Sequence, residues 1–250
     1  MASATTPIPS DVFRWTCPLI VGYLLNFGLH GVLCVQVYYY YMAFPKDRVI
    51  SKCLVFGLFL LENVQLILAT HNTFTVFVIG YGNVDALFAV NLQWISIPIT
   101  AAITSGTVQI SFAYRIYLLS RSKIAGIIIT AVALLQVASA FVVGVQYSHR
   151  GSLRDSDPKT NLTLALWFVG SAVCDIIITI FLTYFLSRQR TDIKATQKLV
   201  TRVTRLTIEN GFLTAAVATL AAALCLPFPG TNYHVAPALL LGKLYSITYR

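Results

Sequence analysis

Charged residues are scarce in this chain of 250 residues, of which only 11% are Asp, Glu, Lys or Arg. Soluble domains usually carry about 25% charged residues, so this composition excludes an ordinary soluble domain. Negatively charged residues are rarer than positively charged ones: the chain has nine Asp and Glu but 18 Lys and Arg. With 57% hydrophobic residues, the chain has the composition of a polytopic helical membrane protein.

Motifs that carry well-defined chemistry are also missing. The sequence has no GxSxG, no Gly-rich phosphate loop, no HExxH and no paired carboxylates, so we expect neither an enzyme nor a bound cofactor. His71, His149 and His234 lie at predicted helix ends but share no metal-binding spacing, so no metal site is predicted. The five cysteines lie in or beside apolar runs without a CxxC pair, and we expect no disulfide or zinc framework.

Long apolar runs are what the sequence does contain. A helix rises about 1.5 Å per residue and a bilayer core is about 30 Å thick, so about 20 apolar residues can cross it. The predicted spans are 17–42, 50–70, 91–118, 124–147, 163–187, 206–226 and a shorter run from Val235 to the C-terminus. We therefore predict an all-α fold: a bundle of seven transmembrane helices over 17–250, with a short or truncated last helix, after a polar tail over 1–16. Residues 71–90 are predicted to form a loop, and Pro98 is predicted to kink the third span.

Basic residues are distributed unevenly between the predicted loops. Twelve Lys and Arg lie in the first, third and fifth turns or the adjoining helix ends, against four in the N-terminal tail and the other loops. Because cytoplasmic loops are enriched in Lys and Arg, we expect the N-terminus outside, in the plasma membrane or another membrane of the secretory pathway. Asn161-Leu162-Thr163 is a glycosylation sequon on the predicted outer side. Confinement of the cations to short loops also argues against nucleic-acid binding.

Strongly polar side chains occur inside the predicted spans, where they are costly. Counted from the span ends, five lie near the bilayer midplane: His30, Glu62, Gln136, Asp175 and Lys243. One interpretation of this midplane layer is a polar pocket or ion path at the centre of the bundle. The other is interhelical pairing that specifies packing, with Lys243 beside Asp175 or Glu62.

The segment between the fifth and sixth runs carries a candidate cytoplasmic basic surface. Its members are Arg188, Arg190, Lys194, Lys198, Arg202 and Arg205. The last four recur every three or four residues, so we expect the sixth helix to extend beyond the membrane as an amphipathic helix. The partners that this surface predicts are anionic lipid headgroups or a cytoplasmic protein.

Several motifs resemble those of a known family. They include Gly170-Ser171-Ala172-Val173-Cys174-Asp175, Leu206-Thr207-Ile208-Glu209-Asn210-Gly211 and Gly242-Lys243-Leu244-Tyr245-Ser246. In these the chain resembles the seven-span membrane proteins of mushroom-forming fungi that carry a domain of unknown function in their C-terminal half. The resemblance implies such a domain at about 170–250 and a seventh helix that continues past Ser246, which is why a truncated last helix is expected here. It implies no chemistry, because the family has no established activity.

Together these features predict a multi-pass membrane protein with a receptor- or sensor-like layout and an outside N-terminus. The alternative is a transporter or channel in which Glu62, Asp175 and Lys243 form an ion-coupled path.

Overall fold

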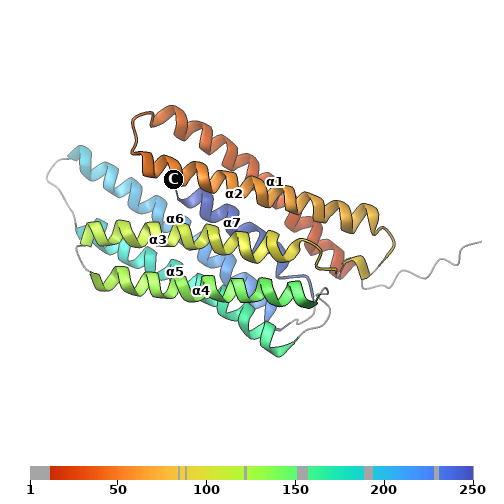
Figure 1. Cartoon of the computed structure of the whole chain (residues 1–250). Coiled ribbons are helices and arrows are strands. Elements are labelled where there is room, and N and C mark those ends of the chain that lie inside the picture. Colours follow the sequence, from red (N-terminus) through yellow and green to blue (C-terminus); the bar gives the residue numbers. More distant parts are fainter. Residues whose placement is uncertain are drawn as a thin grey trace, which may run out of the picture.

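The fold is an elongated bundle of helices that run roughly along one axis (Figure 1). The computed structural model describes residues 12–83, 85–87, 89–120, 123–150, 157–188, 194–227 and 231–249. Its long helices are α1 (Val12–Ala43), α2 (Val49–Phe74), α3 (Thr100–Ser120), α4 (Lys123–Arg150), α5 (Pro158–Arg188), α6 (Lys194–Cys225) and α7 (Val235–Thr248). Three short turns complete the described part: the π-helices η1 (Thr75–Ile79) and η3 (Ile95–Ile99), and the 3₁₀ turn η2 (Asp85–Leu87).

The predicted fold class is confirmed. Six helices are long and apolar enough to cross a membrane, and α7 is a shorter apolar helix of 14 residues. At about 1.5 Å per residue, α7 is about 21 Å long. Tyr249, directly after α7, packs on Phe112 of α3 with ring centroids 6.2 Å apart. Because α3 continues from Phe112 to Ser120, α7 ends before its neighbour does.

Many large apolar side chains point out of the bundle, and most of the strongly polar side chains within the spans are buried inside it. On α2 the outward positions include Phe56, Leu60 and Ile67, the last two 67% and 68% exposed. The buried face of α2 consists of Val55, Leu58, Glu62, Gln65, Ala69 and Asn72, spaced three or four residues apart. A soluble bundle would expose mainly polar side chains, so this apolar outer surface is suited to lipid.

Small residues allow the helices to approach closely. A methyl group added at Gly22 of α1 would lie 2.8 Å from the backbone Cα of Ala236 in α7, so this crossing requires glycine. At Gly211 of α6 the added carbon would lie only 2.0 Å from Oγ1 of Thr179 in α5. Small residues at crossings are typical of membrane bundles, where close packing replaces hydrophobic association.

The second membrane helix is longer than predicted. The expected loop over 71–90 is wrong in its first half, because α2 and η1 continue the helix to Ile79. Asn72 is buried and its Oδ1 accepts a 3.2 Å hydrogen bond from the backbone N–H of Leu92. This bond fixes the end of the loop on α2. Where a kink is predicted, Pro98 lies in the π-helical turn η3, a departure from α-helical bonding that is consistent with the N–H that proline lacks.

Two further helices begin at an earlier residue than the apolar runs that predicted them. Helix α5 begins at Pro158 instead of Thr163, because Asp157 caps it: its Oδ1 accepts the N–H of Lys159 at 3.2 Å. The pKa of the Asp157 carboxyl is lowered mainly by its hydrogen bond from this N–H, and further by the hydrogen bond from Arg150. Helix α6 begins at Lys194, which confirms the predicted helical extension before the sixth apolar run.

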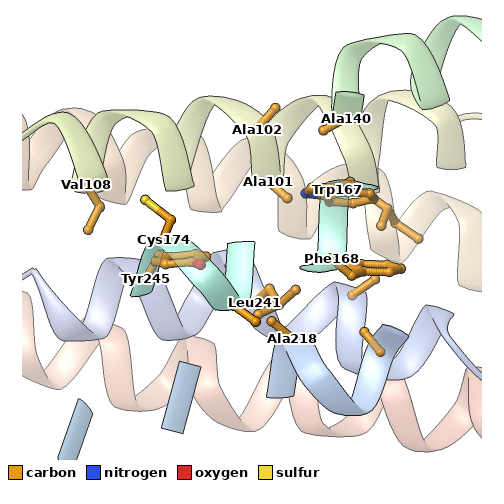
Figure 2. Close-up of a cluster of buried hydrophobic side chains, with 14 of the residues drawn as sticks. Ala101, Ala102, Val108, Ala140, Trp167, Phe168, Cys174, Ala218, Leu241 and Tyr245 are labelled. Carbon is orange, nitrogen blue, oxygen red and sulfur yellow. The ribbon is translucent and has the colours of Figure 1, made fainter. Parts of the chain in front are cut away.

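Helix α7 occupies the middle of the bundle. It packs against α1, α2, α3, α6 and η3, although it is the last helix in the chain (Figure 1). Tyr245 of α7 and Cys174 of α5 point into the same core, and Trp167 stacks on Phe168 with ring centroids 4.7 Å apart (Figure 2). Every helix that surrounds α7 can therefore place a side chain against it.

A buried polar network around helix α7

An ion pair joins α7 to α2 in the interior of the bundle. The Nζ of Lys243 lies 2.8 Å from Oε2 of Glu62, and the two side chains are 0% and 2% exposed. Lys243 also donates a hydrogen bond of 2.8 Å to the backbone oxygen of Glu62. Of the two pairings that the sequence left open for Lys243, the structure contains the one with Glu62.

The second carboxylate oxygen of Glu62 is also bonded. Its Oε1 accepts hydrogen bonds from Thr104 of α3 at 3.1 Å and from Ser246 of α7 at 3.2 Å. Gly242 leaves room for this oxygen, since an added methyl carbon there would lie 3.2 Å from Oε1. We call Glu62, Thr104, Lys243 and Ser246 the ion-pair cluster. Two opposite charges neutralise each other in it, which makes their burial tolerable.

A second cluster is built around Asp175 of α5. Its Oδ1 accepts a 3.1 Å hydrogen bond from Nε2 of Gln109 in α3, and its Oδ2 accepts one of 2.7 Å from the Tyr245 hydroxyl. The Tyr245 oxygen also lies 2.6 Å from Oγ of Ser171. Gln136 of α4 extends the chain of bonds by donating to Oε1 of Gln109 at 2.6 Å. These five residues form the carboxylate cluster.

The two clusters differ in charge. Glu62 has Lys243 as its partner, whereas the hydrogen-bond partners of Asp175 within the described part of the chain are neutral. Asp175 is nevertheless only 3% exposed. A lone carboxylate inside a membrane bundle is costly unless a proton or a cation neutralises it.

A small cavity lies beside Asp175. Its volume is about 20 Å³, enough for one water-sized particle. Its lining comes from α3, α5, α6 and α7 and includes polar groups of Gln109, Asp175, Thr179, Thr214, Tyr245 and Thr248. The carboxylate cluster is therefore not completely filled by protein.

His30, the fifth member of the predicted midplane layer, is not a member of either cluster, although the charges of Glu62 and Lys243 act on it. Its ring stacks on Phe59 of α2 with ring centroids 6.0 Å apart. The structure thus brings Glu62 and Lys243 together in one cluster, and Gln136 and Asp175 in the other. Asn161 lies in the first turn of α5 and is partly exposed, and its glycosylation stays a prediction.

The N-terminal end of α7 has its own cavity. It also measures about 20 Å³, and its lining includes Gln93, Tyr147, Trp167 and His234. Burial lowers the pKa of His234 to about 4, so this imidazole is neutral near pH 7. The described residues contain no group of three His, Cys, Asp or Glu placed to hold a metal ion.

The candidate basic surface lies outside the residues whose side chains are described. Arg188 ends α5, and Lys194, Lys198, Arg202 and Arg205 follow the backbone of α6, but residues 186–207 carry no described side-chain positions. The basic surface therefore stays a prediction.

The residues that the sequence analysis missed are neutral. The cluster members that it missed are Thr104 and Gln109 of α3, Ser171 of α5, and Tyr245 and Ser246 of α7. Ser105 of α3 also accepts a hydrogen bond from Gln136. The predicted layer contained no member from α3, although Gln109 links Gln136 to Asp175. Gln109 could have been identified from the sequence, because it is an amide in an apolar run, which is the feature that identified Gln136.

The C-terminal part of the chain matches a known family model. Residues 171–250 match the model described as a family of unknown function, DUF6534. No curated protein and no solved structure matches the chain. The match lies where the resemblance placed a domain of unknown function, and it contains Asp175, Lys243 and Tyr245. Their partners Glu62 and Gln109 lie outside it, so the polar network joins the matched part to the preceding helices.

Proposed function

We propose that this multi-pass membrane protein is a receptor or sensor, and not an enzyme, in which α7 carries the signal. One observation carries the proposal: the short segment 242–246 of α7 is bonded to α2, α3 and α5 at once. A change in any one of these helices therefore alters the bonds that hold α7. An element with two discrete arrangements, held by several neighbours, is the usual basis of a switching transition.

The input and output of such a sensor would lie at opposite ends of the bundle. The cavity beside His234 adjoins the first residues of α7, on the side that we expect to face outward. On the other side, α7 packs against α6, which begins in the basic segment around Lys194. Movement of α7 would thus reach the proposed cytoplasmic surface through α6. The resemblance to seven-span fungal membrane proteins is consistent with this layout and adds no ligand.

The test measures whether the core network controls the position of α6. Spin labels are placed at Leu118 of α3 and Ile208 of α6, which are 56% and 40% exposed, after the exposed Cys34 and Cys53 are replaced by serine. Distances are measured by pulsed electron resonance in nanodiscs. We expect Tyr245→Phe to change the distance distribution and Tyr184→Phe, on the lipid-facing surface, to leave it unchanged.

Unchanged distributions in Tyr245→Phe and in Asp175→Asn would contradict the sensor proposal. So would ion-dependent uptake into proteoliposomes that Asp175→Asn abolishes.

The alternative function is transport coupled to an ion. One observation favours it: Asp175 lies beside a water-sized cavity without a cation among its described bonding partners. Transporters often use carboxylates at this depth as proton or ion carriers. The uptake measurement distinguishes a transporter from a sensor, because a sensor does not have to move an ion or a solute across the membrane.

A further inference from the structure

We propose that the cavity beside Asp175 is a binding site for a small monovalent cation of the size of Na⁺. The argument begins with charge. The ion-pair cluster contains one carboxylate and one ammonium group, so it is neutral as built. The carboxylate cluster contains Asp175 with amide and hydroxyl partners, so it carries one uncompensated negative charge when Asp175 is ionised.

The cavity provides the room. A space of about 10–15 Å³ is enough for a water molecule, and this cavity measures about 20 Å³. Asp175 lines it directly. An ionised carboxylate has about four acceptor sites. Gln109 and Tyr245 occupy two, and the Thr214 hydroxyl makes a third interaction, which leaves acceptor capacity for a cation.

The hydroxyl groups around the cavity are arranged as oxygen ligands. Thr179 donates its hydroxyl proton to the backbone oxygen of Asp175 at 2.7 Å. Thr214 donates its proton to the backbone oxygens of Asn210 and Gly211, at 3.3 and 3.2 Å. Each hydroxyl has a single proton, which Thr179 gives to its own helix and Thr214 gives to its own helix or to Asp175, so its lone pairs are left for the cavity. Lone pairs of hydroxyl and carboxylate oxygen are the ligands that hard cations prefer.

The close contact between α5 and α6 helps to form the site. Gly211 lines the cavity, and the carbon added by any other residue would lie 2.0 Å from the Thr179 hydroxyl. Glycine at this position brings the hydroxyls of Thr179 and Thr214, from two different helices, to the same cavity.

The number of charges selects a monovalent ion. One carboxylate and one monovalent cation sum to zero, whereas a divalent ion would leave one net positive charge buried in the bundle. Divalent cations in proteins are usually coordinated by additional carboxylates or water molecules, and this cavity has little room for them. The inference does not depend on whether the protein is a sensor or a transporter, because it concerns binding alone.

The test is direct binding of radioactive ²²Na⁺ to the purified full chain in nanodiscs, at mildly alkaline pH and constant ionic strength maintained with choline chloride. We expect saturable binding that unlabelled NaCl displaces and choline does not. Asp175→Asn keeps the shape of the side chain but removes its charge, and we expect it to weaken binding at least about tenfold. Thermal unfolding should occur at a higher temperature in NaCl than in choline chloride for the wild type only.

A second variant keeps the test valid if Asp175→Asn does not fold. Thr214→Val replaces the hydroxyl by a methyl group of similar size, and we expect several-fold weaker binding. Thr219→Val is the matched control: it lies on the same helix, its hydroxyl also donates to the carbonyl four residues earlier, and its side chain is exposed. It should bind Na⁺ as the wild type does.

Two outcomes would overturn the proposal. One is the absence of saturable ²²Na⁺ binding in the folded wild type, with a stability that responds to pH but not to Na⁺, since a proton alone would then neutralise Asp175. The other is equal binding by the wild type, Asp175→Asn and Thr214→Val, which would locate the ion elsewhere.

Discussion

The hydroxyl of Tyr245 donates a hydrogen bond of 2.7 Å to Oδ2 of Asp175, and this bond joins α7 to α5 in the middle of the bundle. Tyr245 is therefore a structural partner of the only carboxylate in the carboxylate cluster. The same oxygen lies 2.6 Å from Oγ of Ser171. Since Tyr245 gives its only proton to Asp175, the Ser171 hydroxyl is the donor in this second contact.

Removal of this hydroxyl should destabilise the protein. Tyr245→Phe leaves both Asp175 and Ser171 with one partner fewer, and we expect a loss of about 1–3 kcal/mol in unfolding free energy. The measurement is reversible unfolding in detergent, followed by intrinsic fluorescence. Tyr184→Phe, on a ring that is 55% exposed, is the control and should change stability little. Equal losses in the two variants would contradict a role for the buried bond.

The ion pair between Glu62 and Lys243 predicts strong coupling between two substitutions. Lys243→Met leaves the Glu62 carboxylate buried without its cation, and we expect a loss of about 3–5 kcal/mol. Adding Glu62→Gln should recover most of that loss, because the Gln oxygen can still accept from Thr104 and Ser246. A double-mutant cycle of unfolding measures this coupling. Strictly additive losses would mean that the two charges do not interact.

The crossing of α1 and α7 predicts that two similar glycines respond differently. Gly22→Ala places its methyl carbon 2.8 Å from the backbone of Ala236, so the helices must separate, and we expect destabilisation of about 1–3 kcal/mol. Gly28→Ala, on the same helix, meets nothing within 4 Å and should be neutral or stabilising by up to about 1 kcal/mol. Thermal unfolding of the two variants side by side is sufficient. Similar losses of stability in both variants would show that the contact with Ala236 does not determine the effect of the substitution at Gly22.

His234 predicts a pH dependence of stability. Burial lowers its pKa from 6.5 to about 4, so the unfolded chain binds a proton more readily than the folded chain does. Stability is then complete above about pH 6.5 and falls as the pH decreases towards 4. Stability measured across this range should fall less steeply in His234→Gln than in the wild type. Parallel pH curves for the two proteins would exclude this assignment.

The sequence predicted the spans well because span formation depends on local composition. The apolar runs, the short seventh run and the helical extension at Lys194 follow from length and periodicity alone. Helix ends were predicted less well, since they depend on caps such as Asp157 and on contacts such as that of Asn72 with the 89–92 segment.

Which polar residues meet could not be derived from the sequence. Depth in the membrane was sufficient to select Glu62, Asp175 and Lys243, but pairing depends on helix rotation and on which helices are neighbours. The choice of Glu62 over Asp175 as the partner of Lys243 follows from the packing of α7 against α2. Gln109 was missed because a search for charges does not detect a neutral amide that bridges two other polar groups.

The order of synthesis gives the ion pair a consequence for biogenesis. Glu62 and Lys243 are separated by 181 residues, so α2 is synthesised long before α7. Until then, α2 carries an acid without its partner, and helices that hold such an acid are poorly retained in a bilayer. A nascent chain released before Lys243 should thus expose an unpaired Glu62 to the quality-control machinery of the membrane, so that correct assembly of α2 depends on the synthesis of α7.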